Sequence, residues 1–257
     1  MTQPPGPGLP SGDAETIVVV TARDEAERIV ATIAALRGAF PGAPIVVGDD
    51  GSRDHTAALA GEQSALVVAV PRRGKGATAT IAAARALELG GPGTTYLLCD
   101  ADLGSSARLL SALVAEIRAG RADLAIASFE APRGGGFGVA LAFARAAVRW
   151  VTGAELVAPL SGQRALSADA LRATLPFAPG FGMELAMTID ALRSGLRVSE
   201  IALALEHRSS GRTPCGFLHR SRQLLDFAAV FVRRAKVRRS APNSHSRAAA
   251  RTGPAPP

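Results

Sequence analysis

The sequence has few aromatic residues and few cysteines. Phe, Trp and Tyr make up 4% of its 257 residues, while Gly, Ala, Val and Leu dominate, which suits small-residue helices packed on a sheet. The two cysteines, Cys99 and Cys215, lie far apart and in no spacing typical of a metal site. We therefore expect a protein of a reducing cytoplasm. Because free cysteine is usually buried, Cys99, within an apolar run, is expected in the core.

The sequence also lacks any apolar run near the roughly 20 residues that a helix needs to span a bilayer. Residues 1–13 are rich in Pro and Gly, and they lack the apolar centre of a signal peptide. This composition predicts a disordered N-terminal tail. We expect a cytoplasmic protein, either soluble or peripheral on the inner face of the cell membrane.

Most of the chain carries no net positive charge. Residues 1–205 carry 18 basic and 20 acidic residues, a net charge of −2, whereas residues 206–257 carry 11 and 2, a net charge of +9. This asymmetry indicates that the tail meets an anionic surface such as phosphate, nucleic acid or membrane. Nucleic acid is the least favoured partner, because the aromatic residues that stack on bases are scarce there.

Lysine is rarer still, since the chain has only Lys75 and Lys236. Lys75 stands between Gly74 and Gly76. A compact ammonium group between two glycines suits a phosphate or a hydroxyl group where a guanidinium fork is too large. The alternative is an ordinary solvated loop lysine.

Apolar runs alternate with helical patterns, and this alternation is regular up to residue 128. Four strand–helix units in succession predict an α/β protein with a mostly parallel sheet and helices on both faces. A glycine-rich loop follows at 129–138. Strands are expected at 16–22, 44–50, 65–70, 94–100, 123–128 and 196–205, and helices at 24–40, 55–63, 76–89, 107–120, 139–152, 168–175 and 181–195.

Carboxylates follow two of these strands. Asp49 and Asp50 end the second strand, and Asp100 and Asp102 follow the fourth. Such residues are common helix N-caps, but the carboxyl ends of parallel strands are also where α/β proteins bind ligands. Two carboxylates at i and i+2 suit one Mg²⁺ or Mn²⁺ ion that completes its shell with water and substrate phosphates. The pattern predicts a metal–diphosphate site.

Six segments in order resemble glycosyltransferase family 2, which has the Rossmann-like GT-A fold. They are VVVTARDEAERI, VVGDDGSRDHT, RRGKGAT, LLCDADLG, SGQRALS and GFGMEL. Each segment alone is weak, whereas the ordered set is specific. The resemblance implies a GT-A domain over 14–213, and within the family it is nearest to polyprenyl-phosphate glycosyltransferases of the dolichol-phosphate mannosyltransferase type. Residues 240–257 are expected to be a disordered tail.

The resemblance also implies roles for individual residues. Glu184 faces the reacting region, either as a general base for a hydroxyl acceptor or as an ordinary first-turn acid of its helix. His207 is a third metal ligand or a surface histidine. The implied sets are Asp102 and Glu184 for catalysis, Thr21, Arg23, Glu25, Asp50, Lys75 and Asp100 for the donor, Asp100, Asp102 and His207 for the metal, and Arg133, Arg164, Arg208 and Arg212 for the acceptor or its phosphate.

Some positions depart from the family pattern. Thr21 replaces a common Pro, Arg23-Asp24 replaces an aromatic-Asn pair, and Gln163 replaces an aromatic residue. These changes leave the sugar and the acceptor open. The leading hypothesis is a metal-dependent, inverting transferase that uses a nucleotide sugar and a polyprenyl phosphate acceptor. The alternatives are a soluble family 2 transferase acting on a small hydroxyl acceptor such as phosphoglycerate and, less favoured, a sugar-phosphate nucleotidyltransferase.

The segment 214–239 is expected to form a basic amphipathic helix. An apolar stripe bordered by arginines is typical of a helix in an anionic membrane interface. The alternative is that the stripe packs on the catalytic domain or on a second subunit, and the oligomeric state stays open. On a helix, the stripe comprises Phe217, Leu218, Leu224, Leu225, Ala228, Phe231 and Val232.

Overall fold

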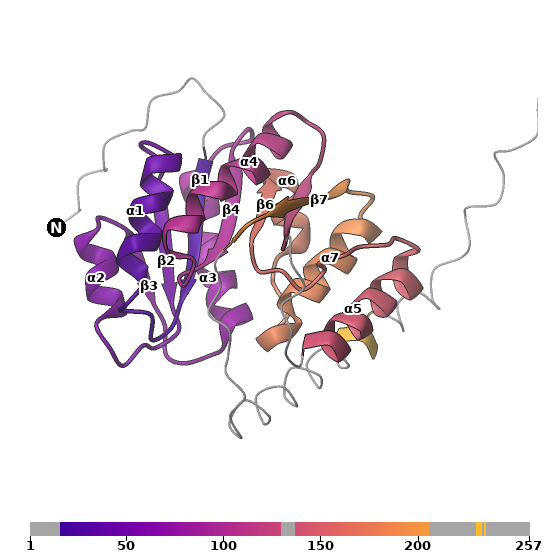
Figure 1. Ribbon diagram of the computed structural model, residues 1–257, viewed down its shortest axis with the longest axis horizontal. Coiled ribbons are helices and arrows are strands. Elements are labelled where there is room, and N and C mark those ends of the chain that lie inside the picture. The colour runs from indigo at the N-terminus through magenta and orange to yellow at the C-terminus, as the bar shows by residue number, and fades with distance from the viewer. Residues whose placement is uncertain (1–15, 130–136, 206–229, 233, 235–257) are drawn as a thin grey trace, which may run out of the picture.

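The computed structural model describes residues 16–129, 137–205, 230–232 and 234 (Figure 1). The strands of this part form one sheet in the order β3-β2-β1-β4-β6-β5-β7. Strand β6 runs antiparallel to both neighbours, and the other pairs are parallel, so the predicted mostly parallel α/β sheet is confirmed. The strands are β1 (Thr16–Ala22), β2 (Ile45–Asp49), β3 (Leu66–Ala69), β4 (Thr95–Asp100), β5 (Leu124–Phe129), β6 (Arg164–Ser167) and β7 (Val198–Leu203).

The helices match the predicted ones except at the first and the fourth. The first begins at Ile29 rather than near residue 24, because Asp24 adopts a positive φ of 53° that a helix does not allow. The fourth opens with a 3₁₀ turn over Gly104–Leu110. The helices are α1 (Ile29–Ala39), α2 (Thr56–Glu62), α3 (Lys75–Leu89), α4 (Ser111–Arg118), α5 (Phe137–Thr152), α6 (Ala168–Thr174) and α7 (Met183–Arg193).

Strand β1 is buried on both faces, because successive side chains of a strand point to opposite sides. Val18 and Val20 belong to the cluster beneath α1 and α4, while Ile17 and Val19 belong to the cluster beneath α3, α6 and α7. Full burial of one such side chain stabilises the fold by about 1.5–3 kcal/mol. These two layers explain why a β-branched run with few aromatic residues supports a stable sheet.

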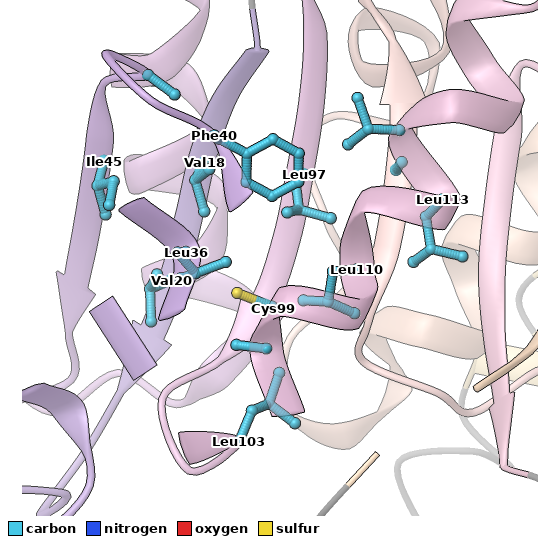
Figure 2. Close-up of a cluster of buried hydrophobic side chains, with 14 of the residues drawn as sticks. Val18, Val20, Leu36, Phe40, Ile45, Leu97, Cys99, Leu103, Leu110 and Leu113 are labelled. Carbon is cyan, nitrogen blue, oxygen red and sulfur yellow. The ribbon is translucent and has the colours of Figure 1, made fainter. Parts of the chain in front are cut away.

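Cys99 lies inside the first of these clusters (Figure 2). It is 2% exposed, as the sequence predicts for a small core residue. Burial raises the pKa of the Cys99 thiol above its usual range, and the neighbouring Asp100 carboxylate adds to this shift. The thiol is therefore a packing group and not a nucleophile.

Helix α5 packs on α7 rather than on the sheet (Figure 1). Val230 and Phe231 of the C-terminal part join a third hydrophobic cluster, which α5 and α7 form. The Phe231 ring lies 5.9 Å from that of Phe143, edge to face, and 5.3 Å from that of Trp150, between ring centroids. Arg234 pairs with Asp190 of α7, with Nε and Oδ1 2.8 Å apart. Phe231 and Arg234 thus tie the described C-terminal residues to α5 and α7.

This anchoring bears on the predicted amphipathic helix. Phe231 belongs to its apolar stripe, but it packs on α5 instead of facing a membrane. For Phe231 the structure therefore favours the alternative, packing on the catalytic domain, while Val232 stays 49% exposed. Residues 214–229, 233 and 235–239 lie outside the described residues. Within the described part, no helix has both the length and the apolar character to cross a bilayer.

Candidate active site

The site is built where β1, β2 and β4 end. In the parallel register, Thr21 of β1 pairs with Gly48 of β2 on one side and with Asp100 of β4 on the other. The Thr21 hydroxyl also donates to Asp100 Oδ1 over 3.2 Å. The same register sets Asp50 and the Asp100–Asp102 segment on either side of β1. The sheet thereby gathers the acidic groups that the sequence predicted at this edge.

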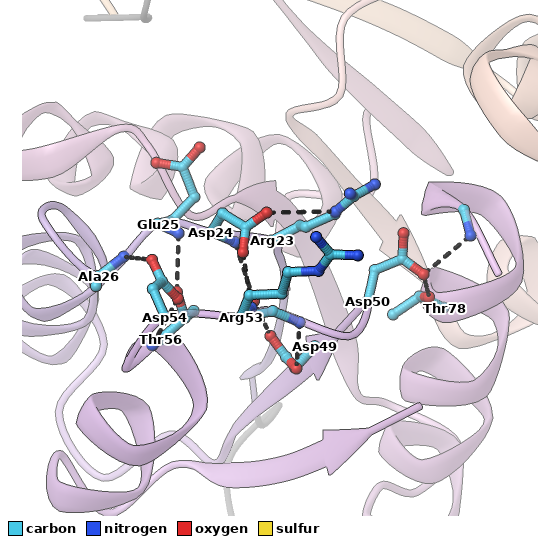
Figure 3. Close-up of polar contacts among 12 residues, drawn as sticks. Arg23, Asp24, Glu25, Ala26, Asp49, Asp50, Arg53, Asp54, Thr56 and Thr78 are labelled. Carbon is cyan, nitrogen blue, oxygen red and sulfur yellow. Dashed lines mark hydrogen bonds and ion pairs between the residues drawn. The ribbon is translucent and has the colours of Figure 1, made fainter. Parts of the chain in front are cut away.

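Asp50 organises the loop that precedes α3 (Figure 3). Its Oδ1 accepts hydrogen bonds from the backbone N–H groups of Arg73 (2.8 Å) and Gly74 (2.9 Å) and from the Thr78 hydroxyl (2.9 Å). All of these bonds fall on one oxygen, and among the described residues none is shown bonded to Oδ2. The carboxylate also fixes the first turn of α3, whose first residue is Lys75.

The loops after β1 and β2 are clasped together by side chains (Figure 3). The Asp24 carboxylate accepts a hydrogen bond from the Arg53 backbone N–H over 2.8 Å, and the Glu25 N–H donates to Thr56 Oγ1 over 2.8 Å. Asp54 accepts from the Thr56 hydroxyl, which lowers the pKa of the Asp54 carboxyl. The clasp fixes the backbone from Arg23 to Glu25, where the sequence predicted contacts with the donor.

Lys75 lies between two carboxylates. Its Nζ atom is 2.7 Å from Asp100 Oδ1 and 2.8 Å from Glu184 Oε1. Glu184 comes from the first turn of α7 and is buried. Burial opposes the charge on Lys75, but the two carboxylates outweigh it and raise the pKa of Lys75 above its usual range. The cation that faces Asp100 in the structure is therefore a side chain of the protein.

The Asp100–Asp102 loop is held through its backbone. Ala101 donates its N–H to the Thr21 carbonyl over 3.1 Å, and the Thr32 hydroxyl donates to the Ala101 carbonyl over 2.7 Å. Arg28 Nη1 donates to the Asp102 carbonyl over 3.1 Å. The Asp102 carboxylate is thus presented from a fixed backbone. Sequence reasoning missed Arg28, the N-cap of α1, and Thr32, which stands four residues later on the helix.

Arg164 differs from the prediction. Its guanidinium is fully buried and donates to the carbonyls of Ser161 (2.7 Å) and Pro159 (2.8 Å) and to the Thr188 hydroxyl (2.9 Å). Burial lowers the pKa of Arg164 to about 10, while the carboxylates of Glu184 and Glu200 oppose this shift. Since its described bonds go to protein groups, Arg164 orders the 159–161 loop against α7, and its position does not support contact with an acceptor phosphate.

Comparison with known proteins agrees with this geometry. The model of the family described as glycosyl transferase family 2 matches residues 17–154. The chain belongs to glycosyl transferase family 2. No curated protein sequence matches it significantly. The nucleotide-sugar glycosyltransferase with a GT-A fold that the sequence predicted is thereby confirmed, and the nucleotidyltransferase alternative loses its support.

Solved structures of glucosyl-3-phosphoglycerate synthase from Mycobacterium tuberculosis are similar to this chain. Its complex with Mn²⁺, UDP and glucosyl-3-phosphoglycerate is 30% identical with a TM-score of 0.69, over 90% of this chain and 82% of that one. Its complex with Mg²⁺ and UDP is 30% identical with a TM-score of 0.70, over 90% and 81%. Its complex with Mn²⁺, UDP-glucose and phosphoglyceric acid is 27% identical with a TM-score of 0.66, over 85% and 80%.

The donor set of this family 2 site fits a hard divalent ion. Asp100 and Asp102 supply carboxylate oxygens on a rigid loop, the ligands that Mg²⁺ and Mn²⁺ prefer. Among the described residues, no group of three His, Cys, Asp or Glu forms a complete cluster. Asp100 is engaged by Lys75, and Asp102 lies two residues further on the same loop. His207, Arg133, Arg208 and Arg212 lie outside the described residues.

Proposed function

We propose that this chain transfers a sugar from a nucleoside diphosphate sugar to a hydroxyl group of a small phosphorylated acceptor such as phosphoglycerate. The observation that carries this proposal is the pairing of Lys75 with Asp100 and Glu184, beside Asp102. It occurs in a chain whose sequence is 30% identical to that of glucosyl-3-phosphoglycerate synthase, with 90% of the chain covered. The reaction would invert the anomeric configuration.

Asp102 would hold Mg²⁺ or Mn²⁺, which offsets the charge on the departing nucleoside diphosphate. Asp50, whose described bonds fall on Oδ1, would accept a base N–H at Oδ2. The backbone around Arg23 and Glu25 would line the nucleoside, because the clasp to the loop after β2 keeps it in one conformation.

Glu184 would act on the acceptor. A hydroxyl group needs a base as it attacks, whereas a phosphate oxygen is already anionic. Glu184 is buried, projects from the first turn of α7 and is held by Lys75 at 2.8 Å. This arrangement holds the Glu184 carboxylate in one orientation, which suits a base that takes a proton from a bound hydroxyl group. It favours the small hydroxyl acceptor over polyprenyl phosphate, the leading hypothesis from the sequence.

Polyprenyl phosphate, an anionic membrane surface and a cytoplasmic location remain predictions from the sequence. The anchoring of Phe231 on α5 weakens the membrane hypothesis for this part of the tail. A small phosphorylated acceptor, like polyprenyl phosphate, would bring a phosphate group near the reacting centre.

The experiment is a screen of UDP- and GDP-sugars with MnCl₂ against phosphoglycerate, glycerol 3-phosphate and a polyprenyl phosphate in detergent. The expected product is a glycosylated phosphoglycerate, formed with Mn²⁺ and not with excess EDTA. Transfer to polyprenyl phosphate alone would overturn the proposal of a small phosphorylated acceptor. Transfer that persists in EDTA would overturn the metal requirement.

A further inference from the structure

Gln163 extends the pairing of β4 with β6 beyond the backbone ladder. The ladder ends at the pair Leu98–Arg164. Past that point, the Gln163 side-chain amide takes its place: Nε2 donates to Asp100 Oδ2 over 3.1 Å, and Oε1 accepts the Asp100 backbone N–H over 3.2 Å. Gln163 is 2% exposed. One buried amide thus satisfies both the main chain and the carboxylate of Asp100.

Gln163 is itself fixed by its neighbours. Its backbone carbonyl accepts the Ala127 N–H of β5 over 3.0 Å. The amide therefore approaches Asp100 from a constant direction. It occupies Oδ2, while Oδ1 receives Lys75 and the Thr21 hydroxyl. Each oxygen of the carboxylate has its own partner, and the carboxylate cannot rotate without losing both.

Gly162 leaves the space that this arrangement needs. A Cβ atom at this position would lie 2.7 Å from Asp100 Oδ2 and 2.8 Å from Lys75 Nζ. Both distances are shorter than real Cβ contacts allow. The atoms that would move are the ends of two side chains, so a methyl group would displace the Lys75–Asp100 pair rather than the backbone.

We propose that Gly162 and Gln163 are positioning residues that hold the Asp100 carboxylate against Lys75, and so keep Lys75 between Asp100 and Glu184. Gln163 supplies the contact that directs the carboxylate, and Gly162 supplies the room for the pair. A neutral amide is required, since a carboxylate at position 163 would face Asp100 Oδ2 at about the 3.1 Å of the present bond and repel it.

The first test reads the position of Lys75 without any substrate. Since Lys75 and Lys236 are the only lysines, a Lys236→Arg background leaves one lysine to follow. The rate of Lys75 acetylation by an N-hydroxysuccinimide ester is measured by peptide mass spectrometry, with Gly162→Ala and Gln163→Met added in turn. We expect acetylation at least fivefold faster in both, because an amine released from two carboxylates is more exposed to the reagent.

Matched controls make the same chemical changes elsewhere. Gly38→Ala adds a methyl group where nothing lies within 4 Å, and Gln63→Met changes a glutamine at the end of α2. Neither should alter Lys75 acetylation by more than twofold. Acetylation of Lys75 at the parent rate in both Gly162→Ala and Gln163→Met would overturn the proposal.

The second test rests on the proposed function and separates positioning from folding. Gln163→Met should lower kcat about 10- to 100-fold, the usual effect of losing a hydrogen bond to a charged group. The Kd of UDP with Mn²⁺ should stay within about twofold, because Thr21, Thr32 and Arg28 hold the Asp102 loop independently. Gln163→Glu, which keeps the acceptor for the Asp100 N–H, should not restore kcat.

If Gln163→Met weakened UDP binding and lowered thermal stability along with kcat, the positioning role would be overturned in favour of a role in folding alone. Recovery of kcat in Gln163→Glu would overturn the need for a neutral amide. If the unsubstituted protein transfers no sugar, the proposed function fails, but the acetylation rates still decide whether Gly162 and Gln163 position Lys75.

Discussion

The Nζ atom of Lys75 lies 2.8 Å from Oε1 of Glu184, joining the first residue of α3 to the first turn of α7. These helices pack on the same face of the sheet, although Lys75 and Glu184 are 109 positions apart in the chain. The same ammonium lies 2.7 Å from Asp100 at the end of β4. One cation therefore fixes three elements at the site.

Lys75→Met should destabilise the protein by about 2–3 kcal/mol, because it leaves two carboxylates close together without their counter-ion. Urea unfolding at pH 7 measures this cost. Lys75→Arg, which keeps the charge but not the compact shape, should lose less stability while still lowering activity. A Lys75→Met variant as stable as the parent would contradict the ion-pair assignment.

The contribution of Lys75 to the free energy of unfolding should fall at alkaline pH. Its pKa is raised in the folded state, so its contribution is fully present below the unfolded pKa of about 10.5 and falls as the pH rises above that value. The gap between parent and Lys75→Met should be constant from pH 7.5 to 9.5 and narrow above pH 10.5. A stability difference that widens above pH 10.5 would contradict the raised pKa of Lys75 in the folded state.

Asp102→Ala should reduce transfer by about 10³-fold or more, since the departing diphosphate would keep its charge. Calorimetric titration with MnCl₂ and UDP should show weaker metal-dependent binding. Asp169→Ala, which removes an exposed carboxylate on α6, is the control and should retain both. Unchanged transfer by Asp102→Ala would refute its role as metal ligand.

Glu184→Gln should lower kcat about 10²- to 10⁴-fold with a hydroxyl acceptor, because the substituted amide cannot take the proton. Binding of UDP with Mn²⁺ should persist. The measurement is steady-state kinetics with phosphoglycerate beside calorimetry with UDP. Near-parental kcat would favour an acceptor that is already anionic, such as a lipid phosphate.

Arg164→Met should cost about 3 kcal/mol or more of stability, because two carbonyls and the Thr188 hydroxyl lose their buried partner. The expected result is a lower midpoint of urea unfolding. If Arg164 contacts the acceptor instead, the variant would keep its stability and raise only the acceptor KM.

Phe231→Ala should destabilise the protein by about 1–2 kcal/mol through loss of its packing on Phe143 and Trp150. Val232→Ala is the matched control, since its side chain is half exposed and should cost less than about 0.5 kcal/mol. Thermal unfolding measures both. Equal stability of Phe231→Ala and the parent, with reduced binding to anionic vesicles, would restore the membrane hypothesis for this segment.

The sequence predicted the sheet well because β1, β2 and β4 are continuous apolar runs between turn residues, and burial on both faces demands that pattern. It predicted Asp50, Asp100 and Asp102 at one edge for the same reason. It failed at Asp24, where a side-chain clasp to Arg53 replaces the first turn of a helix. Local helical spacing carries no information about a bond to a residue 29 positions away.

Arg164 and Lys75 illustrate what sequence patterns leave undecided. The family resemblance implied that Arg164 contacts the acceptor or its phosphate, but the antiparallel pairing of β6 with β4 and β5 buries this residue in the core. Lys75 was expected at the donor, and its pairing with Glu184 arises only when α3 and α7 pack together. Contacts between distant helices depend on tertiary packing, which periodicity does not encode.

Because β6 runs antiparallel to its neighbours, the residues that reach the site lie before this strand in the sequence and not after it. After β1, β2 and β4, the residues that follow each strand reach the site, whereas for β6 the residues that precede it do so. Gly162 and Gln163 thus stand upstream of their strand, and Ser167 ends it at the opposite edge, beside Thr95. Diversification of this enzyme should therefore alter turnover when it touches the stretch before Arg164, whereas a change at Ser167 should affect the start of α6, where the Ala170 N–H donates to the Ser167 side chain.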